Sequence, residues 1–152
     1  QKRIIDTELI KGEPVLFVGD KLSGKSIALA WIAINSNSNV IVLCIGLKQT
    51  QTFITLIKNL LLKRRQCYTI TQYDEIKINN TTIGCYPITR ETCDVFIDDN
   101  VKILLIENID NTHPIVVKMI IDKQPTMMIG CTSMIVSDIF YEIFKNRIVN
   151  DV

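Results

Sequence analysis

The run Gly19-Asp20-Lys21-Leu22-Ser23-Gly24-Lys25-Ser26 fits the pattern G-x-x-x-x-G-K-[ST], in which a glycine-rich loop holds phosphate groups. Residues 15–18 before it form a short apolar run that predicts a buried strand, and residues 27–33 after it continue as an apolar helix. In such a strand–loop–helix unit, backbone N–H groups and the helix N-terminus point at the phosphates. A chance match in a glycine turn is the alternative, and both flanking elements argue against it.

This pattern, the P-loop, gives its residues different roles. Lys25 is expected to reach the β- and γ-phosphates of a nucleotide, and the Ser26 hydroxyl is expected to ligate Mg²⁺. ATP and Mg²⁺ are therefore the expected cofactors. The nucleotide-binding residues predicted in the loop are Gly19, Asp20, Lys21, Leu22, Ser23, Gly24, Lys25 and Ser26.

The composition is that of a globular chain. Its 152 residues are 47% hydrophobic, which suffices for one domain with a real core. The net charge of +1 gives no global footprint for nucleic acid, so any DNA contact must come from a local patch. No signal peptide or membrane-length apolar run is visible. Since the chain starts at Gln1, we expect residues 1–152 to be one domain of a longer protein.

Five cysteines are present, an odd number without a C-x-x-C pair. This usage argues against a zinc or disulfide framework and favours buried thiols in a reducing, intracellular compartment.

Apolar runs alternate with helical patterns, which predicts an α/β fold with a mainly parallel sheet sandwiched by helices. Alternating residues on both sides of Asn79-Asn80 predict a hairpin over residues 75–84. An acidic loop is expected around residues 94–100. Strands are expected at 15–18, 40–45, 103–106 and 127–131, and helices at 27–33, 50–65, 114–123 and 138–145.

A P-loop binds nucleotide, but hydrolysis also needs an acid at the end of a buried strand, and often a neighbouring base. Residues 103–106 are four consecutive apolar residues that run into Glu107-Asn108-Ile109-Asp110. Glu107 is predicted to be the acid on the metal side of the site. The alternative is that Glu107 is only a solvated carboxylate at the end of a strand. Asn108 takes the position of the base, where it can orient a water but cannot accept a proton at neutral pH.

The asparagine at the position of the base leaves three interpretations open. Asp110 acts as the base from the following turn, or another segment or subunit supplies one, or the site binds nucleotide and hydrolyses it poorly. On the next strand, Thr132 and Ser133 are candidate sensors of the γ-phosphate. Ordinary turn chemistry explains these two residues equally well.

The order of these pieces resembles the ATPase domain of viral large terminase subunits, the motors that package DNA into capsids. The resemblance runs from about Gly12 to Lys145. The pieces that carry it are the loop end Leu22-Ser23-Gly24-Lys25-Ser26, the turn and helix Leu47-Lys48-Gln49-Thr50-Gln51-Thr52-Phe53, the hairpin at 75–84, the acid strand Leu104-Leu105-Ile106-Glu107-Asn108, the segment Cys131-Thr132-Ser133 and the helix Phe140-Tyr141-Glu142-Ile143-Phe144.

The resemblance implies a P-loop NTPase of the additional-strand, RecA-like class that couples ATP hydrolysis to translocation of double-stranded DNA. It also implies a homo-oligomeric ring, a portal or other packaging proteins as partners, no membrane, and the host cytoplasm or nucleus as location. A neighbouring subunit often supplies an arginine in such rings. Arg90 and Arg147 are candidates, although a surface role is favoured for both.

This sequence departs from the family's pattern at three places, one of which is a longer stretch between Arg90 and Glu107. Lys21 stands where the family often has Arg, and lysine is the less directional donor. Glu107-Asn108 replaces the usual Asp-Glu pair, which puts independent catalysis in doubt. The family's nuclease domain is also absent from this stretch of sequence.

Other functions compete with a packaging motor. One is another additional-strand ATPase, such as a helicase or an AAA+ protein. A second is a catalytically impaired nucleotide-binding module, which Asn108 favours. The run Lys63-Arg64-Arg65 is either a DNA contact or, more simply, a solvated helix end. His113 is interpreted as a capping or surface residue before the helix that starts at Pro114.

Overall fold

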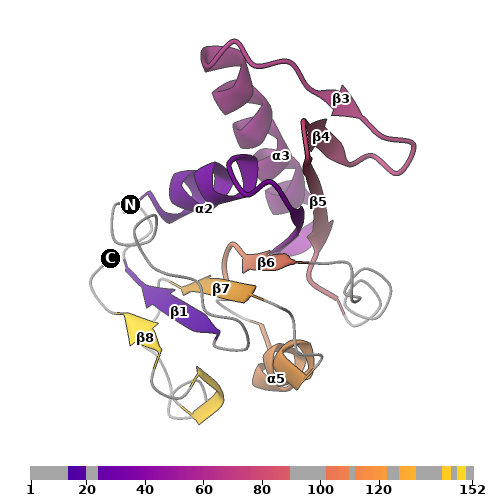
Figure 1. Ribbon diagram of the computed structural model, residues 1–152. Helices are drawn as coiled ribbons and strands as arrows, with labels where there is room; N and C mark the ends of the chain where they lie inside the picture. The colour runs from indigo at the N-terminus through magenta and orange to yellow at the C-terminus, as the bar shows by residue number, and fades with distance from the viewer. Residues whose placement is uncertain are drawn as a thin grey trace.

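An eight-stranded sheet runs through the part of the chain that the computed structural model describes, which is residues 14–19, 24–89, 102–109, 112–122, 127–132, 142–144 and 147–149 (Figure 1). The strand order is β3-β4-β5-β2-β6-β7-β1-β8. The strands are β1 Val15–Val18, β2 Asn39–Cys44, β3 Thr69–Ile70, β4 Ile76–Ile78, β5 Thr81–Pro87, β6 Ile103–Ile106, β7 Met127–Thr132 and β8 Ile148–Val149.

The sheet is parallel from β5 to β8, and the β3-β4-β5 edge is antiparallel. Strand β7 lies between β1 and β6, with Val15 beside Ile129 and Ile103 beside Met127. A strand inserted between the loop strand and the acid strand is the feature that names the additional-strand class. The predicted α/β fold with a mainly parallel sheet is therefore confirmed.

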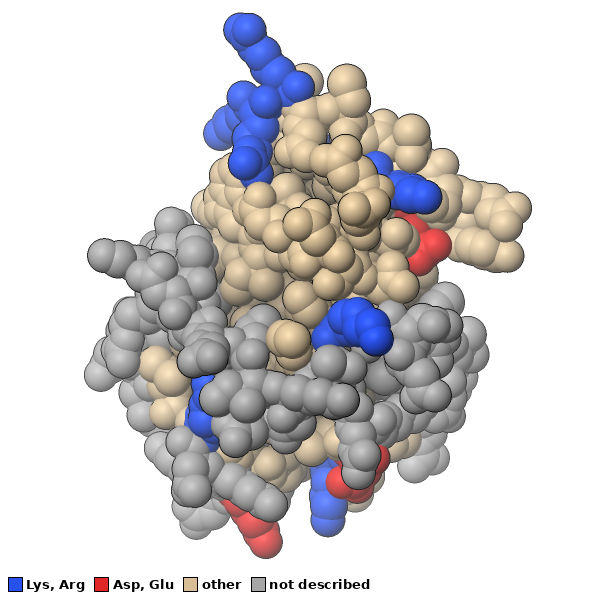
Figure 2. Space-filling view, in the orientation of Figure 1, with Lys and Arg blue, Asp and Glu red and all other residues tan. Residues whose placement is uncertain are grey.

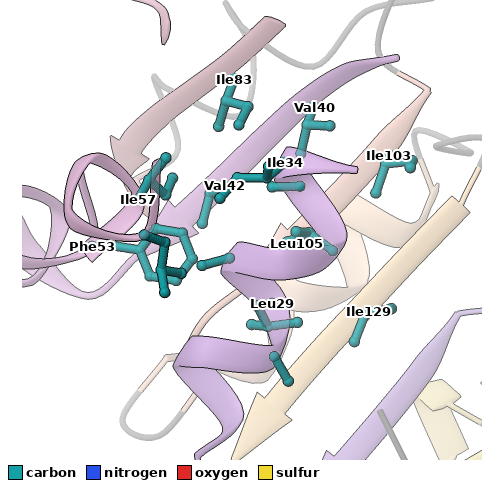
Figure 3. Close-up of a cluster of buried hydrophobic side chains, with 14 of the residues drawn as sticks. Leu29, Ile34, Val40, Val42, Phe53, Ile57, Ile83, Ile103, Leu105 and Ile129 are labelled. Atoms are coloured by element: carbon teal, nitrogen blue, oxygen red, sulfur yellow. The ribbon is translucent and has the colours of Figure 1, made fainter. Parts of the chain in front are cut away.

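Helices cover both faces of this sheet (Figure 1). Helices α2 (Lys25–Ile34) and α3 (Gly46–Lys63) lie on one face, and α5 (Pro114–Asp122) lies on the other. Because successive side chains of a strand point to opposite faces, neighbouring residues of β6 enter different cores. Leu105 packs with Leu29 and Ile57 of the helices α2 and α3 (Figure 3), whereas Leu104 packs with the α5 side.

Most predicted elements form within one or two residues of the expected bounds, but α3 does not. It starts at Gly46, four residues before the expected Thr50, because Gly46 has a φ of +78° that turns the chain out of β2 into the helix. The Thr50 hydroxyl then donates to the Gly46 carbonyl at 2.8 Å. The helix ends at Lys63 instead of Arg65, since Arg65 adopts a φ of +52°.

Two short edge strands, β3 and β8, were not predicted, because two residues are too few for a periodic pattern. The expected loop at 94–100 lies outside the described residues. The expected helix at 138–145 is described only at residues 142–144, which are helical. No helix in the described ranges has the length and hydrophobicity needed to cross a membrane.

The cysteines are less uniformly buried than expected. Cys44 and Cys131 are buried and Cys85 is half-buried, but Cys67 is exposed after the end of α3, so the expectation of buried thiols is wrong at this position. All four are free thiols, and Cys93 lies outside the described residues.

Candidate functional site

Two parts of the sequence that are 81 residues apart meet at the carboxyl ends of the parallel strands. Ser26, in the first turn of α2, donates its hydroxyl to Oε1 of Glu107 at 2.7 Å. Ser26 is held there because the loop after β1 feeds directly into α2, and Glu107 because it follows the last residue of β6. The structure therefore brings together the two residues predicted to ligate Mg²⁺.

Gly24 and Lys25 shape the end of the loop. Gly24 is the N-cap of α2, and its φ of +79° lies in the left-handed region that glycine adopts without a steric cost. Its carbonyl accepts the first helical bond, from the N–H of Ala28 at 3.1 Å. Lys25 is buried and donates Nζ to the carbonyl of Gly19 at 2.7 Å, which closes the loop on itself.

Glu107 is a half-buried carboxyl whose pKa is raised, chiefly by desolvation. The hydrogen bond from Ser26 and the positive charge of Lys25 act in the opposite direction and lower it. The main chain of Glu107 is also fixed, since its N–H donates to the carbonyl of Leu43 at 3.0 Å. This bond carries the parallel ladder of β2 and β6 one residue past the end of the strand.

Three thiols interact electrostatically with this carboxyl, and the sequence interpretation missed this grouping. Burial is the largest cause of the raised pKa values of Cys44, Cys85 and Cys131, and the negative charge of Glu107 raises them further. The pKa is about 12 for Cys85 and for Cys131. The thiols are therefore neutral at pH 7, and they do little to offset the cost of desolvating the Glu107 carboxylate. The positions of these cysteines at or near the ends of β2, β5 and β7 were the available clue.

Thr132 also meets the loop. It is buried at the end of β7, and its carbonyl accepts the N–H of Gly19 at 3.1 Å. This bond links the strand between β1 and β6 to the start of the P-loop. The candidate sensor thus contacts the loop through its main chain.

Asn108 follows Glu107 and is half-buried. The next residue, Ile109, is buried against the α5 side and donates its N–H to the carbonyl of Cys131 at 2.9 Å. Asn108 is therefore held between two anchored residues. The remaining predicted site residues lie outside the described residues: Asp20, Lys21, Leu22, Ser23, Asp110 and Ser133, together with Arg90.

The other predicted residues lie away from this site. His113 accepts the N–H of Ile115 through Nδ1 at 3.2 Å, which confirms its capping role at the start of α5. Arg147 is half-buried beside β1, where its carbonyl accepts the N–H of Leu16 at 2.9 Å. Lys63, Arg64 and Arg65 are exposed at the C-terminal end of α3.

The hydroxyl of Ser26 and the carboxylate of Glu107 are a donor set that fits Mg²⁺. Mg²⁺ prefers hard oxygen ligands and binds through one or two protein groups plus water and substrate phosphates. Because the two oxygens lie 2.7 Å apart, Ser26 and Glu107 would hold the same cation, which would supply neutralisation of negative charge there. The strand order and this pairing together define a fold of the P-loop NTPase type with an additional strand.

Two solved structures share this fold. The large terminase of the thermophilic bacteriophage D6E matches with a TM-score of 0.65 at 12% identity, over 97% of this chain and 40% of that chain. The large terminase of bacteriophage HK97 matches with a TM-score of 0.62 at 12% identity, over 92% of this chain and 35% of that chain. The resemblance to large terminases is thus confirmed at the level of the fold.

This chain spans two fifths or less of either terminase chain. No protein-family model matches the sequence, and no curated protein sequence matches it.

Proposed function

We propose that this chain is an ATP-binding and ATP-hydrolysing motor domain that couples ATP to the translocation and packaging of double-stranded DNA. The observation that carries the proposal is the hydrogen bond of 2.7 Å between Ser26 and Glu107. It supports a working nucleotide site because two motifs far apart in sequence supply complementary Mg²⁺ ligands at one point. The fold shared with two phage large terminases supports the DNA-packaging part.

The chemistry assigned to each residue follows from its position. Lys25 would exchange the carbonyl of Gly19 for phosphate oxygens when ATP enters. Ser26 and Glu107 would hold Mg²⁺, which supplies neutralisation of phosphate charge when bound. Asn108 would orient the attacking water through its amide oxygen. A homo-oligomeric ring on a portal, inside the infected host cell, is the assembly in which we expect the domain to act.

Phosphate release from ATP, measured with and without duplex DNA, tests this function. We expect turnover that DNA stimulates and that Lys25→Ala reduces by about a hundredfold or more, since a charged group aimed at the phosphates is lost. Lys118→Gln removes an exposed cation from α5 and is the control, for which we expect no change. Turnover that Lys25→Ala leaves intact would refute the assignment.

A catalytically impaired nucleotide-binding module is the second candidate, and Asn108 is the observation that favours it. An amide cannot take a proton from water, so ATP would then stabilise an assembly without being consumed. Asn108→Glu separates the two functions. A large gain in turnover identifies a disabled site, whereas a loss identifies a role that Asn108 itself performs in an active one.

A further inference from the structure

Three consecutive cations, Lys63, Arg64 and Arg65, stand exposed at the C-terminal end of α3, and Figure 2 shows Lys and Arg side chains gathered there. We propose that this basic end of α3 binds the phosphodiester backbone of duplex DNA. The inference rests on the proposed function, which makes duplex DNA the substrate, and it names the surface that contacts it. The surface lies at the end of α3 remote from β2 (Figure 1) and beside the last turn of α2, the helix whose first turn holds Lys25 and Ser26.

Arg64 is already held in one orientation. Its guanidinium carbon lies 4.8 Å from the centroid of the Trp31 ring, and its Nη1 donates to Oδ1 of Asn35 at 3.1 Å. A stacked and hydrogen-bonded guanidinium loses less conformational freedom when it binds a ligand. The planar group has five N–H donors, so this contact leaves further donors that fit a phosphate.

Arg65 occupies a position that usually takes glycine. Its φ of +52° is left-handed, and the bonds from the Gln66 N–H to the Leu61 carbonyl at 2.9 Å and from the Arg65 N–H to the Leu62 carbonyl at 3.0 Å close the helix end. This pattern is the helix-ending motif in which glycine is preferred. The turn itself does not require a cation, since glycine would form it at lower conformational cost.

The alternative, that all three cations simply complement the dipole of their own helix α3, does not account for Arg64, whose partner Asn35 is the C-cap of α2. A cation that serves the dipole lies near the last carbonyls of its own helix. The Arg64 guanidinium instead contacts Trp31 and Asn35 at the end of α2. Among the described residues, no carboxylate forms an ion pair with any of the three cations.

The surroundings of the basic end also suit a DNA backbone. Tyr68, three residues after Arg65, is 36% exposed. Tyrosine hydroxyls contribute to phosphate contacts alongside Lys and Arg. Within the whole chain the net charge is only +1, so a local cluster of this kind is where an anionic duplex finds charge complementarity.

Fluorescence anisotropy of a labelled duplex of about 30 base pairs, titrated with the full chain at several salt concentrations, tests the proposal. In the triple variant Lys63→Gln, Arg64→Gln, Arg65→Gly we expect affinity at low salt to fall about tenfold or more. The slope of log Kd against log salt should fall by about 2 to 3, because each lost phosphate contact removes about 0.9.

A single substitution guards against an effect on folding. Arg65→Gly removes one charge while keeping the left-handed turn, and we expect the salt slope to fall by about 1. The matched control, Lys118→Gln, removes one exposed cation from α5 on the opposite face of the sheet and should leave the slope unchanged. The thermal unfolding midpoint of each variant, measured by circular dichroism, identifies any that fails to fold.

Two results would overturn the inference. One is a triple variant, folded as shown by its unfolding midpoint, that binds the duplex with wild-type affinity and slope. The other is a wild-type chain that does not bind the duplex. Neither result touches ATP turnover or its loss in Lys25→Ala, so the nucleotide part of the proposed function stands or falls by that separate measurement.

Discussion

At the scale of single residues, Glu107 balances opposing influences on one carboxyl. Desolvation raises its pKa, and the Ser26 hydroxyl and the Lys25 charge lower it. Without these two partners the pKa of the half-buried carboxyl would be raised further, and a protonated carboxyl is a poor ligand for a cation. The contact between Ser26 and Glu107 is therefore both a structural bond and the basis of the proposed metal site.

A double-mutant cycle measures that contact in the absence of nucleotide. Ser26→Ala removes the donor and Glu107→Ala removes the acceptor of the hydrogen bond, and the cycle isolates their interaction. From denaturant unfolding we expect a coupling free energy of about 1.5–3 kcal/mol, the range of a hydrogen bond to a charged group. Strictly additive effects would mean that the bond contributes nothing to stability.

The buried thiols make stability depend on alkaline pH. Cys85 and Cys131 have pKa values of about 12 in the folded chain, above the ordinary value of 9.0 that they regain on unfolding. Between these values the unfolded chain has lost the proton and the folded chain keeps it, so stability is full below pH 9 and falls as pH rises. Each thiol should lower the unfolding free energy by about 1.4 kcal/mol per pH unit.

Cys131→Ala isolates one of these contributions. We expect the unfolding free energy of this variant, measured with denaturant between about pH 9 and 11, to fall less steeply with pH than that of wild type. The difference in slope is the contribution of one thiol. The comparison with wild type cancels the titration of other groups. An unchanged slope would contradict the burial of a titrating thiol at this position.

At the scale of elements, two strand-to-helix connections each depend on a glycine with positive φ. Gly24 starts α2 at a φ of +79°, and Gly46 starts α3 at +78°. Both mark a strand-to-helix connection on one edge of the sheet, but only Gly24 belongs to the P-loop pattern. Alanine substitutions at these two glycines therefore distinguish the cost of backbone strain, expected at both, from an effect on nucleotide binding, expected only at Gly24.

Gly24→Ala and Gly46→Ala should each destabilise the chain by about 1 kcal/mol, because alanine is strained in the left-handed region. A Cβ at Gly46 meets no atom within 4 Å, so backbone strain is its main effect. Only Gly24→Ala should also weaken ATP binding, measured with a fluorescent analogue. Equal ATP affinity in both variants would contradict the assignment of Gly24 to the phosphate site.

Sequence reasoning identified the long elements because their periods are clear. The buried strands β1, β2, β6 and β7 follow from continuous apolar runs, and the β4–β5 hairpin follows from alternation around Asn79-Asn80. The early start of α3 was missed because Gly46-Leu47-Lys48-Gln49 is exposed and carries no core pattern. A strand of two residues, such as β3, gives no period at all.

The site was predictable in its residues but not in its contacts. Gly24, Lys25, Ser26 and Glu107 follow from a motif and from an acid after an apolar strand. The bond from Gly19 to the carbonyl of Thr132 and the thiols around Glu107 depend on strand order. Strand order is set by packing between segments far apart in sequence, which periodicity does not encode.

At the scale of the whole molecule, one sheet separates two cores. The core under α2 and α3 includes Ile57, and the core under α5 includes Ile120; both side chains are completely buried. The proposed nucleotide site lies at the end of the strands that both cores support. Because the sheet separates the two cores, each core should contribute independently to the free energy of unfolding.

Ile57→Val and Ile120→Val test this separation with a small change in volume. Each should destabilise the chain by about 0.5–1.5 kcal/mol, the usual effect of removing one buried methylene. Because the residues lie on opposite faces of the sheet, the double variant should show the sum within about 0.5 kcal/mol in denaturant unfolding. A larger deviation would mean that the two cores form a single cooperative packing unit.

The central claim is that Ser26 and Glu107 form one Mg²⁺-dependent nucleotide site. The most direct measurement is the affinity of the full chain for ATP with Mg²⁺ and with EDTA, in wild type, Ser26→Ala and Glu107→Gln. We predict that Mg²⁺ tightens binding about tenfold or more in wild type, and that each variant loses most of this gain. Wild-type affinity that ignores Mg²⁺, or variants that keep the full gain, would contradict the account.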